Sequence, residues 1–216
     1  MRLRTVALLA LAGWLVTSSF AIAESVLRRS SIGDVQTLDP QLWVYGQDGN
    51  IAQDLFQGLT TLDAAANVQP GSAESWTISP DGKRYTFKLR RGLQWSDGTP
   101  ITSKDFLYSF YRLFDPAMAA ASASLLYAIA NGREVNTGKL PLTKLGISAP
   151  NPNTFVVSLA HPAPYFLDLI VHRALPVPRH VIAKWGDQWT RPEHIVSNGP
   201  FVLAERRKWL KNRFGR

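Results

Sequence analysis

Apolar and polar residues alternate in two long stretches of the chain, and this pattern predicts two β-hairpins. Between residues 74 and 90, apolar residues recur at every second position on both sides of Pro80-Asp81-Gly82, a typical turn sequence. Residues 145–162 repeat the pattern around Asn151-Pro152-Asn153. Each hairpin is expected to have one apolar face.

Helical spacing follows the first hairpin, after a second turn at Ser96-Asp97-Gly98. Thr102 and Asp105 fit a capping box, and Asp115-Pro116 predicts the end of this helix. Its apolar stripe consists of Phe106, Phe110, Leu113 and Phe114. Weaker patterns predict helices in 50–63, 117–130 and 162–171, a strand in 31–42 that ends in a turn at Asp39-Pro40, and a strand-like run at 201–203. Strands and helices interleave without a strict βαβ rhythm, so the expected fold class is mixed α/β or α+β.

The first 23 residues have the three parts of a cleavable signal peptide. Arg2 and Arg4 precede a short apolar core at residues 6–16, and Ala21-Ile22-Ala23 is typical of a cleavage site. An uncleaved membrane anchor is the alternative, but the core is short for a membrane span. We expect cleavage after Ala23 and a periplasmic protein. The chain has no cysteine, which excludes disulfides and a lipid anchor of the lipoprotein kind.

The net charge of +8 invites a nucleic-acid interpretation, but the charge is localised. Two basic residues lie in the signal peptide and six lie after Glu205, so residues 24–204 are almost neutral. No basic stripe with interleaved aromatic residues remains in this body, which argues against a nucleic-acid partner. A secreted protein whose cationic tail binds nucleic acid or anionic membrane is the alternative of another class.

Candidate catalytic chemistry is weak throughout the sequence. The four histidines lack metal-binding spacing, and no HExxH, GxSxG or phosphate-binding glycine motif occurs. Ser96-Asp97 is better explained as turn chemistry than as part of a nucleophilic site. We therefore expect neither an enzyme nor a cofactor or metal.

One segment, LWVYGQDG at residues 42–49, has the composition of a binding loop. Trp43 and Tyr45 follow the Asp-Pro turn, and Gly46 and Gly49 allow close backbone approach. The pattern alone leaves open whether this loop binds a ligand or only covers the core.

Six motifs occur in a fixed order between residues 30 and 204: Leu38-Asp39-Pro40, DLFQGL (54–59), the block from ESW at 74 to FDP at 116, NTFVVSLAHPAPYF (153–166), VPRHVIAKWGDQWT (177–190) and NGPF (198–201). In this order they resemble the oligopeptide-binding proteins of bacterial ABC importers, which form the extracytoplasmic solute-binding protein family 5. The pattern DG..YTF.LR....WSDG.P.T..DF is the most specific part of the resemblance.

The resemblance implies a non-catalytic receptor in which two lobes close on a peptide and deliver it to an inner-membrane permease. Such a receptor holds its peptide by strand-like main-chain bonds and is expected to be a monomer. Ligands of other family members, a dipeptide or a murein peptide, stay open as alternatives. The residues that the resemblance places in the ligand cleft are Trp43, Val44, Tyr45, Gly46, Ser122 and Ala123.

Two of these positions depart from the oligopeptide-binding pattern. Ser122 aligns with a tyrosine of close relatives, and Val44 aligns with an acidic residue. Both departures leave the preferred peptide length and side chains open. The WSDG motif is interpreted as a fold signature, without ligand contacts.

The resemblance also implies the domain layout. We expect a type II periplasmic-binding-protein fold in which the first lobe carries an inserted subdomain and the second lobe is absent. The basic residues after Glu205 replace an expected second strand, so the chain is interpreted as an N-terminal fragment with unpaired sheet edges that binds little or no peptide alone. The expected parts are a signal peptide (1–23), the first segment of lobe I (24–57), the inserted subdomain (58–181), the re-entry into lobe I (182–204) and an aberrant basic tail (205–216).

Overall fold

The two predicted hairpins dock on each other as one four-stranded antiparallel sheet in the order β3-β4-β6-β5. The structure is a computed structural model that describes residues 26–30 and 33–206. In the central pair, Tyr85 lies opposite Val157 and Phe87 lies opposite Phe155, and all four residues are buried. The alternation in both hairpins therefore builds a shared apolar face. The strands are β3 (Ala73–Ile78), β4 (Arg84–Leu89), β5 (Ile147–Asn151) and β6 (Thr154–Ser158).

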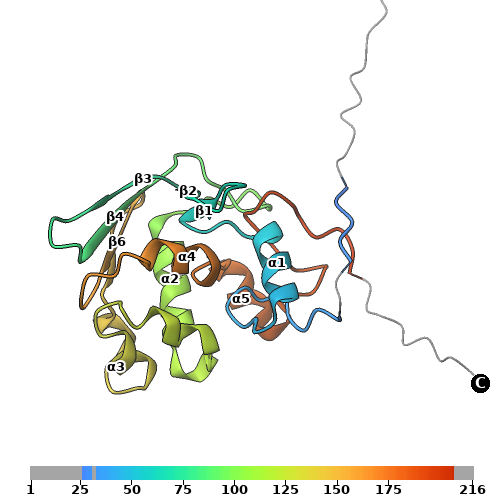
Figure 1. The fold of residues 1–216 in the computed structure, drawn as a ribbon. Coiled ribbons are helices and arrows are strands. Elements are labelled where there is room, and N and C mark those ends of the chain that lie inside the picture. Colours follow the sequence, from blue (N-terminus) through green and yellow to red (C-terminus); the bar gives the residue numbers. More distant parts are fainter. Residues whose placement is uncertain (1–25, 31–32, 207–216) are drawn as a thin grey trace, which may run out of the picture.

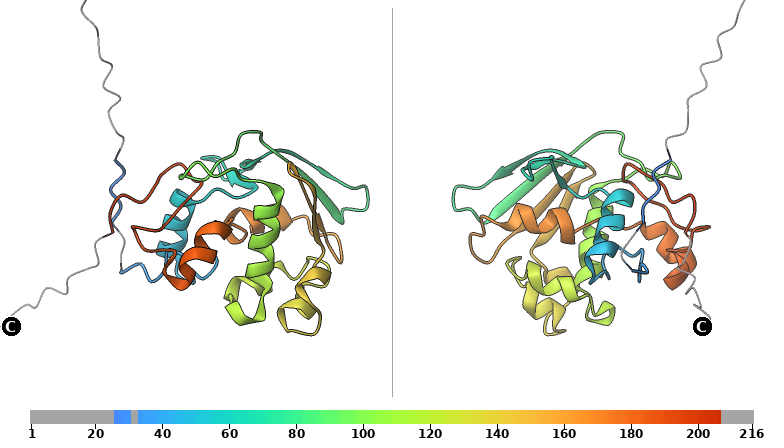
Figure 2. Two further views of the ribbon diagram at one scale, coloured as in Figure 1. Left: turned by 180° about the vertical axis from the view of Figure 1, so that it is seen from behind. Right: turned by 45° about the vertical axis from the view of Figure 1, so that its right-hand side comes forward.

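Helix α2 (Ser103–Phe114) packs against β5 and β6 and runs through the middle of the molecule (Figures 1 and 2). Its predicted capping box is confirmed. The side chain of Thr102 accepts backbone N–H bonds from the first turn, and the backbone N–H of Thr102 donates to Asp105 Oδ2 at 2.7 Å. The predicted apolar stripe is also buried, and the ring centroids of Phe110 and Phe155 lie 5.2 Å apart. The helix thus joins its own apolar face to that of the sheet.

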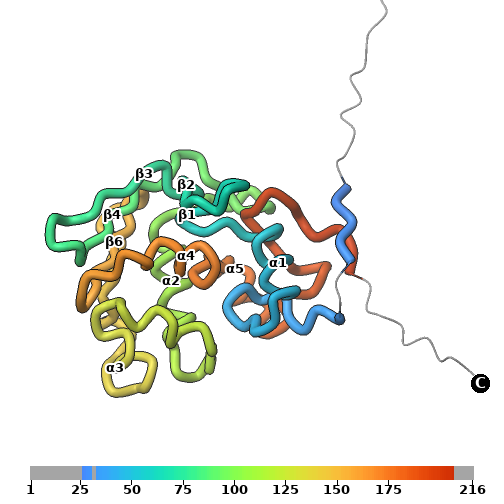
Figure 3. The backbone as a smooth tube through the Cα atoms, in the orientation of Figure 1, coloured from blue at the N-terminus to red at the C-terminus, as the bar shows by residue number. Residues whose placement is uncertain are grey.

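The remaining elements surround α2 and extend the molecule away from the sheet, as the backbone tube in Figure 3 shows. A small second sheet pairs β1 (Thr60–Leu62) with β2 (Val68–Pro70). Among the residues that the structure describes, no helix is both long enough and apolar enough to cross a membrane. The other α-helices are α1 (Gly46–Leu55), α3 (Gly132–Asn136), α4 (Phe166–Arg173) and α5 (Arg179–Trp185), and the 3-10 helices are η1 (Pro116–Met118), η2 (Ala121–Leu126), η3 (Leu142–Lys144) and η4 (Gly186–Gln188).

The two ends of the described chain lie side by side next to α1 (Figure 1). The backbone N–H groups of Gly199 and Phe201 donate to Leu55 O at 2.8 Å and Asp54 O at 3.1 Å. Further along, the Arg206 guanidinium donates to the carbonyl oxygen of Val35. Residues before the sheet and residues after it therefore form one structural region.

The predicted helix over 117–130 is wrong. The chain forms two separate 3-10 helices there, η1 and η2, and Ala119 between them has a left-handed backbone with φ of 47°. An α-helix cannot continue through a residue in this conformation. The Ala- and Ser-rich composition favoured a helix, but the composition carries no information about this break.

Several other element boundaries also need correction. The helix predicted over 50–63 is α1, which begins earlier and ends at Leu55, because Phe56 has an extended backbone with φ of −130° and ψ of 138°; Thr60 then pairs in β1. The helix predicted over 162–171 is α4, which begins only after the two prolines of that segment. No strand forms in 33–42, the described part of the strand predicted over 31–42, or in the strand-like run predicted at 201–203. A strand requires a neighbouring strand for its backbone bonds, and the described chain places none beside either segment.

Candidate functional site

Four of the six residues predicted to contact ligand lie close together: Trp43, Val44 and Tyr45 stand between the Asp39-Pro40 turn and α1, and Gly46 begins the helix. The turn itself is confirmed, because the backbone N–H of Leu42 donates to Asp39 O at 3.2 Å. Tyr45 precedes the helix with an extended backbone, and Gly46 is its first residue. The segment 42–49 was expected to be a loop throughout, and this is a correction: its second half is the first turn of α1.

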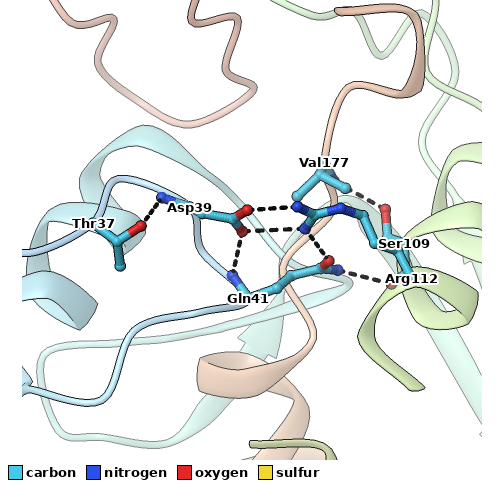
Figure 4. A network of polar contacts seen from close by, with 6 residues as sticks. All are labelled: Thr37, Asp39, Gln41, Ser109, Arg112 and Val177. Atoms are coloured by element: carbon cyan, nitrogen blue, oxygen red, sulfur yellow. Dashed lines mark hydrogen bonds and ion pairs between the residues drawn. The ribbon is translucent and has the colours of Figure 1, made fainter. Parts of the chain in front are cut away.

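A buried ion pair fixes the start of this segment (Figure 4). The guanidinium of Arg112 on α2 donates to Asp39 Oδ2 at 2.7 Å and to Asp39 Oδ1 at 3.3 Å. Only 12% of the Arg112 side chain and 5% of the Asp39 side chain are exposed. A bidentate contact between a guanidinium and a carboxylate is geometrically specific, and it fixes both the position and the orientation of the carboxylate.

Gln41 extends the network from the ion pair to the helix backbone (Figure 4). Its side-chain oxygen accepts from Arg112 at 2.7 Å, and its side-chain nitrogen donates to Ser109 O at 2.8 Å. Its backbone N–H donates to Asp39 Oδ1 at 2.9 Å. The hydroxyl of Ser109 in turn accepts the backbone N–H of Val177 at 2.9 Å. The network therefore joins three chain segments through partners that are themselves held on α2.

The half-buried Trp43 ring lies between two other elements. The Arg173 guanidinium at the end of α4 lies 3.8 Å from the centroid of the ring, which is cation–π geometry. On the helix side, a Cβ atom added to Gly49 would lie 3.0 Å from carbons of the same ring. A side chain at position 49 would therefore press against the Trp43 ring. By contrast, a Cβ atom at Gly46 would meet nothing within 4 Å.

Val44 and Tyr45 form the outward part of the segment. Val44 is 65% exposed and Tyr45 is 57% exposed, and Leu42 is also exposed. Leu42 lies between Asp39 and Trp43, which are held by the two arginines. Val44 and Tyr45 lie between Trp43 and the helix that follows. An exposed, rigid aromatic group of this kind is suited to ligand contact.

Ser122 and Ala123 lie apart from this segment, on η2. The structure buries both, with Ser122 6% exposed and Ala123 0% exposed. Helix α4 lies between the two groups, because it packs against η2 and its last residue, Arg173, covers Trp43. Both residues are closed off from solvent in this conformation, and their role stays a prediction.

The electrostatics near Trp43 come from the end of α4. Burial lowers the pKa of the Arg173 guanidinium from its ordinary value, although it remains a cation. Burial, together with the charge of Arg173, also lowers the pKa of His172 below its ordinary value of 6.5. His172 is therefore neutral at pH 7, and its Nδ1 accepts a hydrogen bond from the side-chain amide of Gln53 on α1. The two neighbouring side chains thus tie α4 to both the loop and α1.

A separate cavity of about 440 Å³ opens at the other end of α1. It lies between the helix end at Gln53 and Asp54, strand β1 and the segment 198–200. The buried hydroxyl of Thr60 beside it has no hydrogen-bond partner among the described residues. None of the six predicted site residues lines this cavity.

Arg112 and Arg173 were not singled out from the sequence. Arg112 shares one side of α2 with Asp105 and Ser109 at helical spacing, which is a detectable sign of a second, polar face. The spacing does not name a partner 73 residues away, however. Arg173 at a helix end is ordinarily explained by the helix dipole, so its contact with Trp43 left no local signal.

Comparison with known proteins relates this geometry to one family. A model of the bacterial extracellular solute-binding proteins, family 5, middle part, matches residues 67–213. The chain is 43% identical over 192 residues to a probable deoxycholate-binding periplasmic protein, YgiS, of Escherichia coli. It is 42% identical over 192 residues to the periplasmic oligopeptide-binding protein OppA of Salmonella typhimurium. Both alignments cover 88% of this chain and 35% of the relative, so the chain spans about a third of the length of these relatives.

Solved structures agree with the sequence comparison. Haemophilus influenzae OppA in complex with the peptide RPPGFSPFR superposes with a TM-score of 0.78 at 38% identity, over 82% of this chain and 35% of that one. The substrate-binding domain of an oligopeptide ABC transporter from Bacillus anthracis gives a TM-score of 0.81 at 35% identity, over 83% of this chain and 35% of that one. The expected fold class, part of the first lobe of a periplasmic-binding-protein fold, is therefore confirmed. The chain belongs to family 5 of the bacterial extracellular solute-binding proteins.

Proposed function

We propose that this chain supplies the first lobe of a periplasmic receptor that captures oligopeptides and delivers them to an inner-membrane ABC permease. The observation that carries the proposal is the exposed pair Val44 and Tyr45 on a segment held by Asp39 and Trp43. Relatives at 42% identity are named as periplasmic oligopeptide-binding proteins, and one similar structure contains a bound peptide. The proposed role is binding without catalysis, after export through the predicted signal peptide.

The proposed domain layout follows the predicted boundaries. Residues 24–57 and 182–204 would form the body of the lobe, and residues 58–181 would form its inserted subdomain. The hydrogen bonds that join Leu55 to Asn198 and Gly199 support this division, because they connect the first and third parts directly. The four-stranded sheet and α2 fall entirely inside the proposed subdomain.

We further propose that peptide affinity requires the part of the receptor that these 216 residues do not include. A closing trap gains its affinity from contacts with both lobes, and this chain covers 35% of its relatives. The chain alone is expected to give no measurable heat when titrated with a mixture of tri- to pentapeptides. Micromolar binding by the chain alone would contradict this part of the proposal.

A chimeric receptor tests whether the lobe itself is competent. Residues 24–204 would be joined to the remaining two thirds of the Escherichia coli oligopeptide-binding relative, which is 42% identical over 201 residues. Calorimetry should then detect micromolar or tighter peptide binding. A chimera that is folded by circular dichroism but binds no peptide would overturn the proposed function.

The same chimera also distinguishes ligand classes. One relative at 43% identity is named as a probable deoxycholate-binding protein, and another at 34% identity as a murein peptide-binding protein. Separate titrations with tripeptides, a murein tripeptide and deoxycholate compare these ligands directly. Preference for the linear tripeptides supports the oligopeptide assignment, whereas selective binding of deoxycholate would replace it.

A further inference from the structure

We infer that Arg112 and Arg173 are positioning residues that hold residues 39–45 in a preformed conformation, so that Val44 and Tyr45, and not Trp43, face the ligand. This inference rests on the proposed function for its ligand, but its geometric part stands without it. The two arginines come from different helices, α2 and α4. Arg112 binds Asp39 and Arg173 packs on Trp43, and these two contacts are called the first and the second clamp.

The first clamp acts on the Asp-Pro turn. Arg112 holds both carboxylate oxygens of Asp39, and one of these oxygens also accepts the backbone N–H of Gln41. The buried carboxylate of Asp39 thus connects α2 to the backbone of the segment, because it binds both Arg112 and the N–H of Gln41. Burying two charges is costly, and hydrophobic side chains of similar volume would often be as stable at such a site. The ion pair is better explained by the geometry that it imposes than by net stability.

The second clamp acts on Trp43. The Arg173 guanidinium lies 3.8 Å from the ring centroid on one side, and the backbone at Gly49 closes the approach on the other. Among the described residues, Arg173 forms no ion pair within 4.0 Å, so the aromatic ring is its evident electrostatic partner. Trp43 was predicted to contact ligand. In this geometry it is an anchor, which immobilises the two residues that follow it.

The clamps leave a short and rigid outward segment. Val44 and Tyr45 are the two most exposed large apolar side chains between residues 39 and 55, and they stand between Trp43 and the first turn of α1. Holding a contact segment in its bound shape before the ligand arrives reduces the entropy lost on binding. Loss of either clamp should therefore loosen this segment without unfolding the sheet.

Amide hydrogen exchange on the full chain tests the inference without any ligand. The Gln41 N–H reports on the first clamp because it donates to the Asp39 carboxylate. The Arg112→Gln variant should raise its exchange rate roughly tenfold or more, since one partner of a buried pair is lost. The Arg112→Lys variant should give a smaller rise in the exchange rate, because an ammonium group keeps the charge but cannot make the bidentate contact with the carboxylate. Amides of β4 and β6 should keep their wild-type rates in both variants.

The assigned NMR signal of the Trp43 indole reports on the second clamp. This signal should shift in Arg173→Gln, and the shift should be smaller in Arg173→Lys. Arg133→Gln is the matched control, because Arg133 is an exposed arginine on a short helix away from the segment. This control should leave both the Gln41 exchange rate and the Trp43 signal unchanged.

Two outcomes would overturn the inference. The first is an unchanged Gln41 exchange rate in a folded Arg112→Gln variant. The second is a rise that the β4 amides share equally, since a purely stabilising contact would act on the whole fold. If Arg112→Gln does not fold, the Gln41 exchange rate in Arg112→Lys and the Trp43 signal in Arg173→Gln take its place. An unchanged value, or a change that the β4 amides share equally, would again overturn the inference. Titrating the chimeric receptor with peptide then separates the two proposals: altered exchange without any peptide binding would refute the function and leave the positioning role intact.

Discussion

Asn198 and Gln57 form a reciprocal pair across 141 residues of sequence. The side-chain oxygen of Asn198 accepts the backbone N–H of Gln57 at 3.1 Å, and its nitrogen donates to Gln57 O at 2.9 Å. One amide group thus satisfies a complete backbone unit in the way that a neighbouring strand would. This contact makes Asn198 a principal connection between the start of the chain and the segment that follows the sheet.

Replacing Asn198 by alanine should therefore destabilise the protein. The backbone N–H of Gln57 loses its partner in a part-buried position, and its carbonyl oxygen keeps only the Ser72 hydroxyl at 3.2 Å, which together costs about 1–3 kcal/mol. Urea unfolding followed by tryptophan fluorescence measures the change. Asn67→Ala is a suitable control, because Asn67 bonds only to the exposed turn at Asp63 and should cost less. Equal losses in the two variants would contradict the proposed importance of the Asn198 contact.

Gly199 should not tolerate a side chain. A Cβ atom there would lie 2.5 Å from the carbonyl carbon of Leu55 and 2.7 Å from the backbone nitrogen of Phe56. Both are backbone atoms that cannot rotate away, so Gly199→Ala should cost about 1–3 kcal/mol or more through forced displacement of the chain. Thermal unfolding measures the loss. Gly46→Ala is the matched control, because the space around Gly46 is open and alanine favours the helix; similar stability of the two variants would refute the steric argument.

The capping box at the start of α2 gives a third test. Thr102→Ala removes the side-chain acceptor for the first turn and should destabilise the protein by about 1 kcal/mol. Thr102→Ser keeps the hydroxyl and should restore most of this loss. Chemical denaturation of the three proteins measures the series. A serine variant as unstable as the alanine variant would assign the effect to the lost methyl group instead of the cap.

Stability should fall in acid through Asp97. Burial alone raises the pKa of this carboxyl, but hydrogen bonds from the Thr99 backbone N–H and from His180 outweigh burial and hold the pKa below its ordinary value of 3.8. A carboxyl with a depressed pKa stabilises the folded state fully above its unfolded pKa. This contribution is lost as the pH falls below 3.8 and through the folded pKa.

Asp97→Asn isolates this contribution. The stability difference between wild type and variant should be constant above about pH 5, where the unfolded carboxyl is already ionised, and should shrink as the pH falls below 3.8. Urea unfolding of both proteins at a series of values from about pH 2.5 to about pH 6 measures this difference. A difference that does not change with pH would show that the Asp97 charge does not contribute.

Local features of the fold could be predicted from the sequence because their causes are local. The hairpin turns and the capping box each depend on residues within a few positions of one another, and all of them are present. The left-handed residue Ala119 left no such signal, since alanine ordinarily favours a helix. The extended segments near Val35 and Val202 looked like strands, but strand formation depends on a partner that lies elsewhere in a structure.

The candidate site was proposed from an aromatic and glycine-rich segment after Asp39-Pro40, and its role in ligand binding stays a prediction. The internal arrangement of this segment could not be predicted. The sequence could not distinguish Trp43, which lies between Arg173 and Gly49, from Tyr45, which is exposed. That distinction depends on where α4 ends relative to α1, which is a tertiary relationship with no local pattern.

The central pairing of β4 with β6 also has a consequence for how the protein folds. Each hairpin can form early because its strands are close in sequence, but the sheet joins two hairpins that are about 70 residues apart. The intervening chain, which contains α2, must close as a loop before the apolar faces of the hairpins can meet. A newly synthesised chain therefore exposes the apolar rows around Phe87 and Phe155 until this long-range step is complete. During that interval the chain is most vulnerable to aggregation and proteolysis.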